Sequence, residues 1–386
     1  MTRPSERLLT LFNVGTLSFG RGAARRCPED LMDRGATRIF IVTTPPTRNL
    51  CEPLLSAIEG RGGQAELWDD LKGEPTLEEF SAALDSARSF GADCVVGLGG
   101  GSAMDVAKLV AALFDGAQTI HDVIGVDLLK NRALPLACVP TTAGTGSEVT
   151  PIAILGDEDE DLKKGVVSRF LTPDAAYLDP LMTVTMPPAV TAATGFDALT
   201  HCIEAYANKF AHPIADTYAL AGISLIANNI ERACTHGDDL DAREAMLLAS
   251  LYGGMCLGPV NTAAVHALAY PLGGEFHIAH GVANALLLPH VLKFKLEADP
   301  ARDAMIARAL GVGQAGDKTT IALRGIGKIV DLAERCNIEQ HMSPFGITAD
   351  AIPRMAKAAM TVTRLLERNP RPLTLPDAVE IYEAAL

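Results

Sequence analysis

The 386-residue sequence contains no apolar run long enough to cross a membrane, so no membrane-spanning helix is expected. Charged residues near the N-terminus, from Met1 to Arg7, have no apolar segment behind them, so no signal peptide is expected either. Basic residues are the minority: 33 Lys and Arg stand against 47 Asp and Glu, for a formal net charge of −14. This balance argues against nucleic acid or an anionic membrane surface as the main partner.

The eight cysteines are scattered, and no C-x-x-C pair occurs among them. Several fall inside strand or helix patterns, as reduced, buried thiols do. A disulfide framework or a thiolate metal site is therefore not expected, and a cytoplasmic location is. No internal repeat or low-complexity segment stands out, and the length allows two domains with a substantial core.

The order of apolar patterns predicts an α/β region followed by an all-helical region. Short β-rich runs occur at Arg38–Thr43, Glu66–Leu71, Cys94–Leu98, Leu136–Val139 and Ala176–Leu178. Helical patterns lie between them, including Leu77–Phe90 and Ala103–Phe114, so we expect a parallel sheet covered on both faces. Beyond Pro187 and Pro188 only helical periodicity remains. We place the boundary near Pro180–Pro188, with an α/β nucleotide-binding domain over 1–183 and an all-helical domain over 184–386.

Four side chains in the second region form a candidate metal site. Asp197 and His201 share one face of a predicted helix, because residues i and i+4 lie one turn apart. His266 and His280 follow in other Ala- and Gly-rich segments. One carboxylate and three imidazoles suit Fe(II), Zn(II), Co(II) or Ni(II). Taken singly, each residue is more often a satisfied core histidine or a surface carboxylate, and spacing alone does not prove an open, catalytic site.

A glycine turn in the first region is a candidate phosphate site. Gly99, Gly100, Gly101 and Ser102 join a buried strand to an amphipathic helix, where backbone N–H groups and the helix dipole favour a phosphate. Gly97-x-Gly99-x-x-Ser102 departs from the dinucleotide fingerprint at its last position. The alternative interpretation is an ordinary capping box made by Ser102 and Asp105, which would shape the turn without filling it.

A second loop, residues 139–150, is rich in small hydroxyls and glycines. Thr141, Thr142 and Thr145 offer donors and a close backbone approach, although a generic Thr/Ser turn is the alternative.

These segments together resemble the iron-containing (group III) alcohol dehydrogenases. The resemblance rests on six motifs in order. They are the 99–102 turn with Asp105 and Lys108, the 140–148 loop, the Asp197/His201 helix, the His266 helix, His280-Gly281 with Asn284, and Asn369-Pro370-Arg371. It implies an N-terminal dinucleotide-binding domain, a helical metal-binding domain, and a cofactor, NAD or NADP, in the cleft between them.

The resemblance also implies roles for single residues. Gly101 and Ser102 would contact the pyrophosphate, Thr141, Thr142 and Thr145 would line the cofactor path, and Lys163 would lie near the ribose unless it is a solvated charge. Asp197, His201, His266 and His280 would hold the metal, Fe(II) by preference or Zn(II), as a Lewis acid. His277 is the candidate for proton transfer, and a rim or supporting histidine is the alternative.

Three positions depart from the commoner family pattern. Thr44 stands where many NAD-using members have an aspartate, so NADP remains open and Arg48 is a candidate partner for its 2′-phosphate. Tyr270 replaces a histidine on the substrate side, and Glu74 replaces an asparagine near the nicotinamide end.

The leading hypothesis is a metal-dependent NAD(P) alcohol dehydrogenase or aldehyde reductase for a small alcohol or aldehyde. The alternatives are a maleylacetate-reductase-like enzyme, a dehydroquinate-synthase-like lyase and a non-catalytic binding protein. The lyase would need lysines and arginines around the metal, which the segments near Asp197, His266 and His280 lack. A homodimer is expected, with an exposed edge strand such as Arg7–Asn13 as one possible contact.

Overall fold

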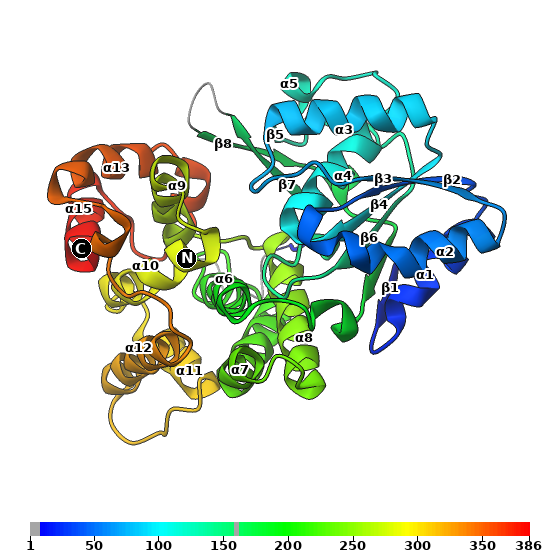
Figure 1. Cartoon of the computed structure of the whole chain (residues 1–386). Coiled ribbons are helices and arrows are strands. Elements are labelled where there is room, and N and C mark those ends of the chain that lie inside the picture. The colour runs from blue at the N-terminus through cyan, green and yellow to red at the C-terminus, as the bar shows by residue number, and fades with distance from the viewer. Residues whose placement is uncertain (1–7, 158–161) are drawn as a thin grey trace. The chain divides into compact units, whose positions relative to one another are not determined.

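A computed structural model describes residues 8–157 and 162–386. The contacts within the chain divide it into two units. The sheet unit comprises residues 12–142 and 146–185, and the helical unit comprises residues 143–145 and 186–386 together with residues 8–11. Each unit has its own architecture (Figure 1).

The sheet unit is built on a six-stranded parallel sheet. Its order is β1 (Thr16–Phe19), β9 (Ala175–Leu178), β6 (Leu136–Pro140), β4 (Cys94–Gly99), β2 (Arg38–Val42), β3 (Gln64–Trp68). The chain runs outward from β2 to β3 and then returns to the other side of β2 as β4. The direction of winding therefore reverses between β2 and β4, and in such sheets ligands bind at the carboxyl ends of the two strands.

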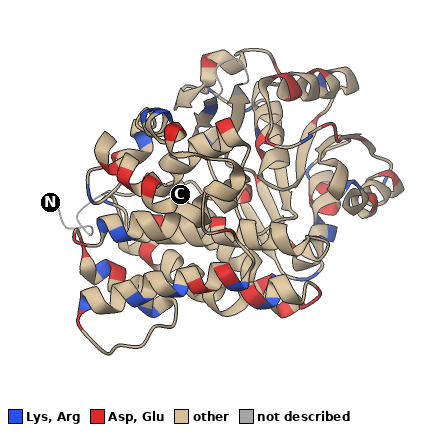
Figure 2. Cartoon of the chain, turned by 60° about the vertical axis from the view of Figure 1, so that its left-hand side comes forward, with Lys and Arg blue, Asp and Glu red and all other residues tan. Residues whose placement is uncertain are grey.

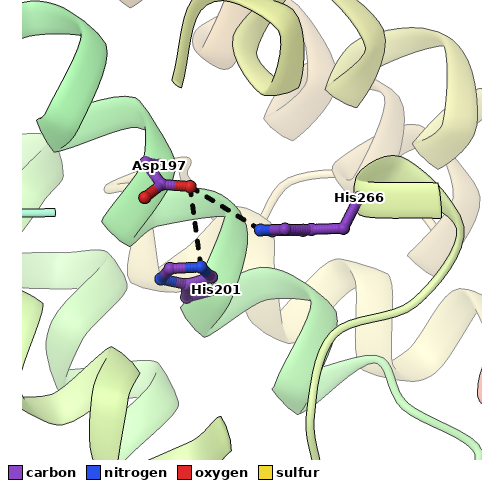
Figure 3. A group of neighbouring side chains, drawn as sticks. All are labelled: Asp197, His201 and His266. Atoms are coloured by element: carbon purple, nitrogen blue, oxygen red, sulfur yellow. Dashed lines mark ion pairs between the residues drawn. The ribbon is translucent and has the colours of Figure 1, made fainter. Parts of the chain in front are cut away.

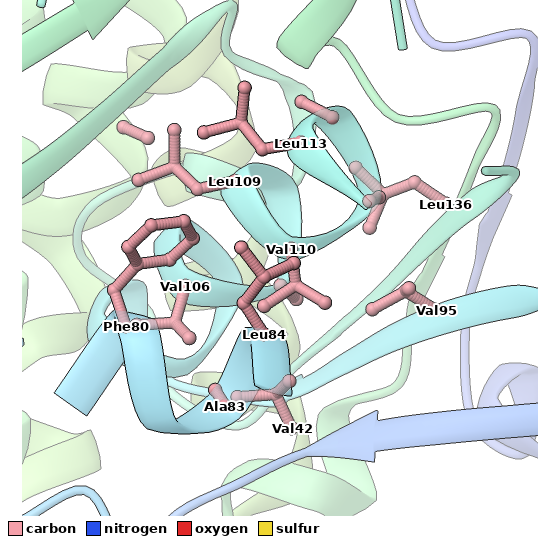
Figure 4. Close-up of a cluster of buried hydrophobic side chains, with 14 of the residues drawn as sticks. Val42, Phe80, Ala83, Leu84, Val95, Val106, Leu109, Val110, Leu113 and Leu136 are labelled. Carbon is pink, nitrogen blue, oxygen red and sulfur yellow. The ribbon is translucent and has the colours of Figure 1, made fainter. Parts of the chain in front are cut away.

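Both faces of this sheet are buried, as predicted. Phe40 and Val42 of β2 pack on one side with α3 (Leu77–Phe90) and α4 (Gly101–Leu113), in the apolar cluster of Figure 4. Ile39 and Ile41 point to the other side and pack with α1 (Arg26–Asp33) and α2 (Glu52–Gly60). A strand whose successive side chains are all apolar fits this position between two helical layers.

A second, three-stranded sheet was not predicted. It consists of β5 (Gly125–Val126), β8 (Leu162–Val167) and β7 (Ile152–Asp157), with β7 antiparallel to β8. The remaining regular elements of the sheet unit are short. They are α5 (Ile120–Val123) and the 3₁₀ helices η2 (Ala23–Arg25), η3 (Pro45–Cys51), η4 (Ser147–Val149), η5 (Arg169–Leu171) and η6 (Pro180–Thr183).

The described residues of the helical unit form helices and no strand, which confirms the predicted fold class. These are α6 (Pro188–Tyr206), α7 (Pro213–Thr235), α8 (Leu240–Leu257), α9 (Ala264–Phe276), α10 (His280–Lys295), α11 (Pro300–Ala309), α12 (Lys318–Arg335), η7 (Ser343–Phe345), η8 (Ala349–Ala351), α13 (Ile352–Ala359), α14 (Thr363–Leu366) and α15 (Leu375–Ala385). Helix α6 contacts α7, α8 and α10, and every residue in its C-terminal part, from Gly195 to Tyr206, is buried. In Figure 2, red and blue segments are interspersed along the outer helices.

The N-terminal edge differs from the expectation. Residues 8–13 form no strand, and Arg7 lies outside the described residues. The first strand is instead β1, which pairs with β9 on one side only and is therefore an edge of the sheet. A search of the described helices finds none with the length and apolarity to span a membrane. The domain boundary at 183/184, the homodimer and the cytoplasmic location stay predictions.

A buried lysine ties α4 to the segment that follows β6. Lys108 is fully buried, and its Nζ donates to Ser147 Oγ (2.7 Å), Thr150 Oγ1 (3.0 Å) and the carbonyl of Ile152 (2.7 Å). Three acceptors satisfy all three ammonium hydrogens, which is the condition for burying this charge.

Asp105, one turn before Lys108, completes this network. It accepts from Ser147 Oγ (2.6 Å) and from the backbone N–H of Ile154 (2.9 Å). The capping-box interpretation of Ser102 and Asp105 is therefore wrong. Helix α4 begins after Gly100 with no side-chain cap, because Asp105 faces the 147–154 segment instead of the helix start.

Replacing Lys108 should test how much this network stabilises the sheet unit. Lys108→Met keeps the apolar stem but leaves the hydroxyls and Asp105 without their cation. We expect the free energy of unfolding to fall by about 3 kcal/mol in urea titrations. The exposed Lys130 supplies the control, since Lys130→Met should change stability by less than about 0.5 kcal/mol. Equal effects of the two substitutions would contradict the network.

Candidate metal centre and nucleotide-binding loops

Helix α6 brings Asp197 and His201 together, as their spacing predicted, and two further helices add the other histidines. Asp197 Oδ1 lies 3.5 Å from His201 Nε2, 3.6 Å from His266 Nε2 and 3.7 Å from His280 Nε2. Figure 3 shows Asp197 and His201 on one helix with His266 pointing at them from another. One carboxylate oxygen is thus surrounded by three imidazole nitrogens from α6, α9 and α10.

These separations suit ligands of one ion better than direct hydrogen bonds. They exceed the usual 2.7–3.2 Å range for a nitrogen–oxygen hydrogen bond. Two ligands bound at about 2.1 Å to a tetrahedral ion lie about 3.4 Å apart. Asp197, His201 and His266 are also buried, with ligand atoms all within 4.8 Å of one another. The donor set therefore fits a divalent ion.

Glu204 orients His266, and the sequence analysis missed it. Its buried Oε2 lies 2.6 Å from His266 Nδ1. A carboxylate at this distance accepts a hydrogen bond from Nδ1–H, so in the neutral ring the lone pair lies on Nε2, which faces Asp197. Carboxylates bonded to a ligand histidine in this way fix the tautomer and the ring orientation at metal sites.

The same carboxylate also anchors the start of α9. Glu204 accepts from the backbone N–H groups of Ala263 (3.0 Å) and Val265 (2.6 Å), which are donors that a helix N-terminus leaves without partners. One side chain of α6 thereby holds both the backbone and the histidine of α9. Its position seven residues after Asp197 on an apolar helix was a signal for this role, since i and i+7 share one face.

The charges of the cluster shift its pKa values in opposite directions. Burial by itself raises the pKa of Asp197, but the nearby imidazoles of His201, His280 and His266 outweigh it and hold the pKa below its usual range. Burial lowers the pKa of His201. Burial also disfavours a charged His266, yet the nearby carboxylates of Asp197 and Glu204 raise its pKa to about 9. Two buried carboxylates thus attract positive charge into this site, which a divalent cation can supply.

Asn284 is the sixth polar side chain at the cluster, after Asp197, the three histidines and Glu204. Its Nδ2 lies 2.9 Å from Asp197 Oδ1, 3.2 Å from His266 Nε2 and 3.3 Å from His280 Nε2. An amide nitrogen has two hydrogens, so it cannot serve all three atoms at once. The bond to Asp197 is the shortest, and it fixes the carboxylate from the α10 side.

A glycine allows α10 to come close enough to place His280. A Cβ atom at Gly281 would lie 2.0 Å from the carbonyl oxygen of Ala193 on α6. Only glycine permits this contact between backbones. The His280-Gly281 pair is thus explained by packing: the glycine brings α10 against α6, and the preceding histidine then reaches Asp197.

The proton-transfer candidate, His277, lies just after α9, and Tyr270, expected on the substrate side, lies on it. Tyr270 is one turn beyond His266 and partly exposed. His277 is exposed and caps the C-terminus of α9 with left-handed backbone angles, φ 53° and ψ 29°. This conformation costs a residue other than glycine about 1 kcal/mol.

The glycine turn of the sheet unit lies at the carboxyl end of β4. A Cβ at Gly97 would lie 2.9 Å from Met104 and Ala107, and one at Gly99 would lie 2.7 Å from Ala103. These two glycines therefore allow α4 to pack on β4. Gly100, Gly101 and Ser102 begin the helix, where their N–H groups are free of intrahelical partners.

The loop of residues 139–150, called the threonine loop below, begins beside this turn. Thr141 donates its N–H to the carbonyl of Gly99 (2.9 Å), and a Cβ at Gly100 would lie 3.3 Å from Thr142. The buried Thr141 hydroxyl has no hydrogen-bond partner among the described residues. Thr145 is partly exposed and falls in the helical unit with Gly144, whose Cβ would meet Thr194. The structure thus brings Thr141 and Thr142 to the glycine turn.

Lys163 and Thr44 occupy different parts of the sheet unit. Lys163 lies on β8, and its Nζ donates to Glu74 Oε1 at 2.7 Å, with only 11% of the side chain exposed. The interpretation of Lys163 as a solvated charge is therefore wrong. Thr44 follows β2, where its hydroxyl lies 2.8 Å from that of Thr47.

A buried acid follows the threonine loop. Both carboxyl oxygens of Glu148 lack a hydrogen-bond partner among the described residues. Burial raises its pKa from 4.5 to about 7, although its own backbone N–H and the Lys108 ammonium oppose the shift. Glu148 therefore resists ionisation near neutral pH.

Comparison with known proteins extends these observations to the whole chain. Residues 15–180 match the sequence family described as iron-containing alcohol dehydrogenase, and residues 191–386 match the C-terminal part of the Fe-containing alcohol dehydrogenase family. The long-chain-alcohol dehydrogenase 1 of Geobacillus thermodenitrificans is 38% identical over 95% of this chain and 94% of its own.

Solved structures agree with the sequence comparison. A 1,3-propanediol oxidoreductase superimposes with a TM-score of 0.95 at 33% identity, covering 98% of this chain and 100% of its own. The sulfoacetaldehyde reductase of Bifidobacterium kashiwanohense, solved in complex with NAD+, gives a TM-score of 0.88 at 28% identity, with 98% and 99% covered.

Glu148 should make stability depend on pH. Its folded-state pKa of about 7 exceeds the unfolded value of 4.5, so the unfolded chain loses the proton first as pH rises. The free energy of unfolding of the wild type, relative to Glu148→Gln, should fall by about 2 kcal/mol between about pH 5 and pH 8. Parallel stability curves for the two proteins in urea titrations would show that the carboxyl is not held neutral.

Glu204→Gln should weaken divalent-ion binding while preserving side-chain shape. The amide retains one acceptor, so it cannot serve His266 and both backbone N–H groups. We expect Zn(II) affinity, measured by competition with a chromogenic chelator, to fall about 10- to 100-fold. Glu297→Gln, an exposed change in the same unit, is the control and should leave the affinity unchanged. Equal affinities for both variants would contradict the orienting role.

Proposed function

Because the chain belongs to the iron-containing alcohol dehydrogenase family, we propose that it catalyses reversible hydride transfer between a nicotinamide cofactor and a small alcohol or aldehyde. The reaction is alcohol plus NAD(P)+ giving the carbonyl compound, NAD(P)H and a proton. The observation that carries the proposal is the convergence of Asp197 Oδ1 with three imidazole nitrogens at 3.5–3.7 Å.

The proposed metal ligands are Asp197, His201, His266 and His280. Their oxygen and nitrogen donors suit Fe(II), with Zn(II) as the alternative. A bound ion supplies Lewis-acid chemistry, which favours loss of the alcohol's proton in one direction and polarises the carbonyl in the other. Glu204 keeps the Nε2 lone pair of His266 available, and Asn284 holds Asp197 in place.

Helix α9 and its C-terminal cap carry the two residues that we assign to the hydroxyl proton and to the substrate. His277 is exposed at the end of α9, so its imidazole can exchange a proton with solvent. Tyr270 lies one turn after the ligand His266 on the same helix, where it can contact the substrate. We assign proton transfer to His277 and substrate positioning to Tyr270.

The cofactor is assigned to the carboxyl edge of the parallel sheet. The N–H groups at the start of α4 suit a pyrophosphate, because a helix N-terminus favours an anion. The unpartnered hydroxyl of Thr141 offers a further hydrogen bond. The residues assigned to cofactor binding are Thr44, Gly99, Gly100, Gly101, Ser102, Thr141, Thr142, Thr145 and Lys163.

The lyase alternative lacks support in the charges of the metal centre. The titratable side chains that act on the pKa values of Asp197, His201 and His266 are the cluster's own histidines and carboxylates. For these three described residues, no lysine or arginine is among them. A site for a phosphorylated substrate would place cations there.

His266→Ala should remove bound metal and activity together. The purified protein is assayed for metal by elemental analysis and for NADH and NADPH oxidation with a panel of small aldehydes. Loss of Lewis-acid stabilisation worth several kcal/mol should lower kcat/KM about a thousandfold or more. His236→Ala, at an exposed helix end, should behave as the wild type. Undiminished turnover in metal-free His266→Ala would reject the proposed function.

A further inference from the structure

A group of threonine hydroxyls lies at the carboxyl ends of the parallel strands, at the point where the strand order reverses. This end of the sheet is called the carboxyl edge below. Thr47 Oγ1 lies 2.9 Å from Thr43 Oγ1 and 2.8 Å from Thr44 Oγ1. A Cβ at Gly99 would lie 3.8 Å from the same Thr47 oxygen, so these hydroxyls are adjacent to the glycine turn. In doubly wound sheets the ribose of a dinucleotide binds at the end of the strand beside that turn.

An arginine and an aspartate lie next to these hydroxyls. Arg48 of η3 donates from Nη1 to Asp69 Oδ2 at 2.6 Å. Asp69 directly follows Trp68, which pairs with Val42 in the neighbouring strand, so its carboxylate lies at the same edge as Thr43 and Thr44. Arg48 is therefore already bonded to an anion, which changes its expected role as a 2′-phosphate partner.

On the assumption that the proposed function is right, we propose that Asp69, paired with Arg48, makes this chain select NAD(H) over NADP(H). Thr44, just after β2, is uncharged where many NAD-using relatives have an aspartate. Asp69, just after the neighbouring strand β3, provides a negative charge at the same end of the sheet. The threonine hydroxyls can hydrogen-bond ribose hydroxyls without needing a charged partner.

The balance of charge at this edge disfavours a phosphate. Arg48 and Asp69 cancel each other, and Glu52 also lies within electrostatic reach of the guanidinium. A 2′-phosphate adds nearly two negative charges. To bind it, Arg48 must leave Asp69, and the released carboxylate then faces the phosphate. Rejection by a misplaced charge of this kind is a common source of specificity.

A second arginine–aspartate ion pair, at the amino ends of the same strands, provides a matched control. Arg61 bonds to Asp33. Asp33 ends α1 before β2, and Arg61 follows α2 before β3, so both lie at the amino ends of these strands. Asp33→Asn removes the same charge from the same kind of exposed ion pair, but away from the strand ends that face the proposed ribose site.

The test measures dissociation constants for NADH and NADPH by fluorescence titration of the full chain. The wild type should bind NADH more tightly. Asp69→Asn should strengthen NADPH binding about tenfold and leave NADH within about twofold, with a difference that shrinks at high salt. Arg48→Ala should weaken NADPH further, because it leaves Asp69 unpaired. Asp33→Asn should change neither constant.

The outcomes separate this inference from the proposed function. Tighter NADPH than NADH binding by the wild type would overturn the inference alone, as would an unchanged ratio in Asp69→Asn. Binding of neither dinucleotide would overturn the proposed function and the inference with it. A ratio that shifts in Asp69→Asn but not in Asp33→Asn supports it.

Discussion

Two carboxylates on one face of α6 are the constraint on which the helical unit depends. Asp197 and Glu204 are both buried, and an isolated buried carboxylate costs several kcal/mol. Each must therefore find compensation: Glu204 finds it at a later helix, and Asp197 finds it both on α6 itself and on later helices. Glu204 is satisfied by His266 and the start of α9, and Asp197 by three imidazoles and Asn284. The geometry of the candidate metal centre follows from satisfying these charges.

Close packing makes that compensation possible. Gly281 lets the backbone of α10 reach α6, and Gly253 lets α8 approach the Cβ of His201 within contact distance. A larger residue at Gly281 would force α10 away from α6 by more than the tolerance of a metal site, which is a few tenths of an ångström, and a Cβ at Gly253 would press on His201 from 3.2 Å. The glycines and the polar side chains therefore act together. Close packing of the helices fixes where the polar side chains lie, and the buried carboxylates favour a cation among them.

Local sequence patterns predicted five of the six strands of the large sheet, with β1 missed, and the Asp197/His201 pair, because periodicity and i, i+4 spacing are local properties. The pairs His266–Glu204, Arg48–Asp69 and Lys108–Ser147 could not be derived in this way, since each joins segments brought together only by folding. The same reason explains the error at Asp105, whose better partners lie beyond residue 146. The three-stranded sheet was missed because β5 spans only Gly125–Val126 and gives no periodic signal.

Three aspartates show how the same type of side chain takes different roles in different surroundings. Asp105 packs against the fully buried Lys108, so its charge is neutralised within the fold and stabilises it. Asp197 is buried among neutralisable imidazoles, so its charge remains available to a cation that is not part of the chain. Asp69 is partly exposed, and it pairs with the exposed guanidinium of Arg48. Because water screens that pair, its contribution to stability is small, and its charge acts mainly on what approaches from solvent. Burial and the chemistry of the partner thus distinguish an aspartate that holds the fold together from one proposed to bind a metal and from one proposed to select a ligand.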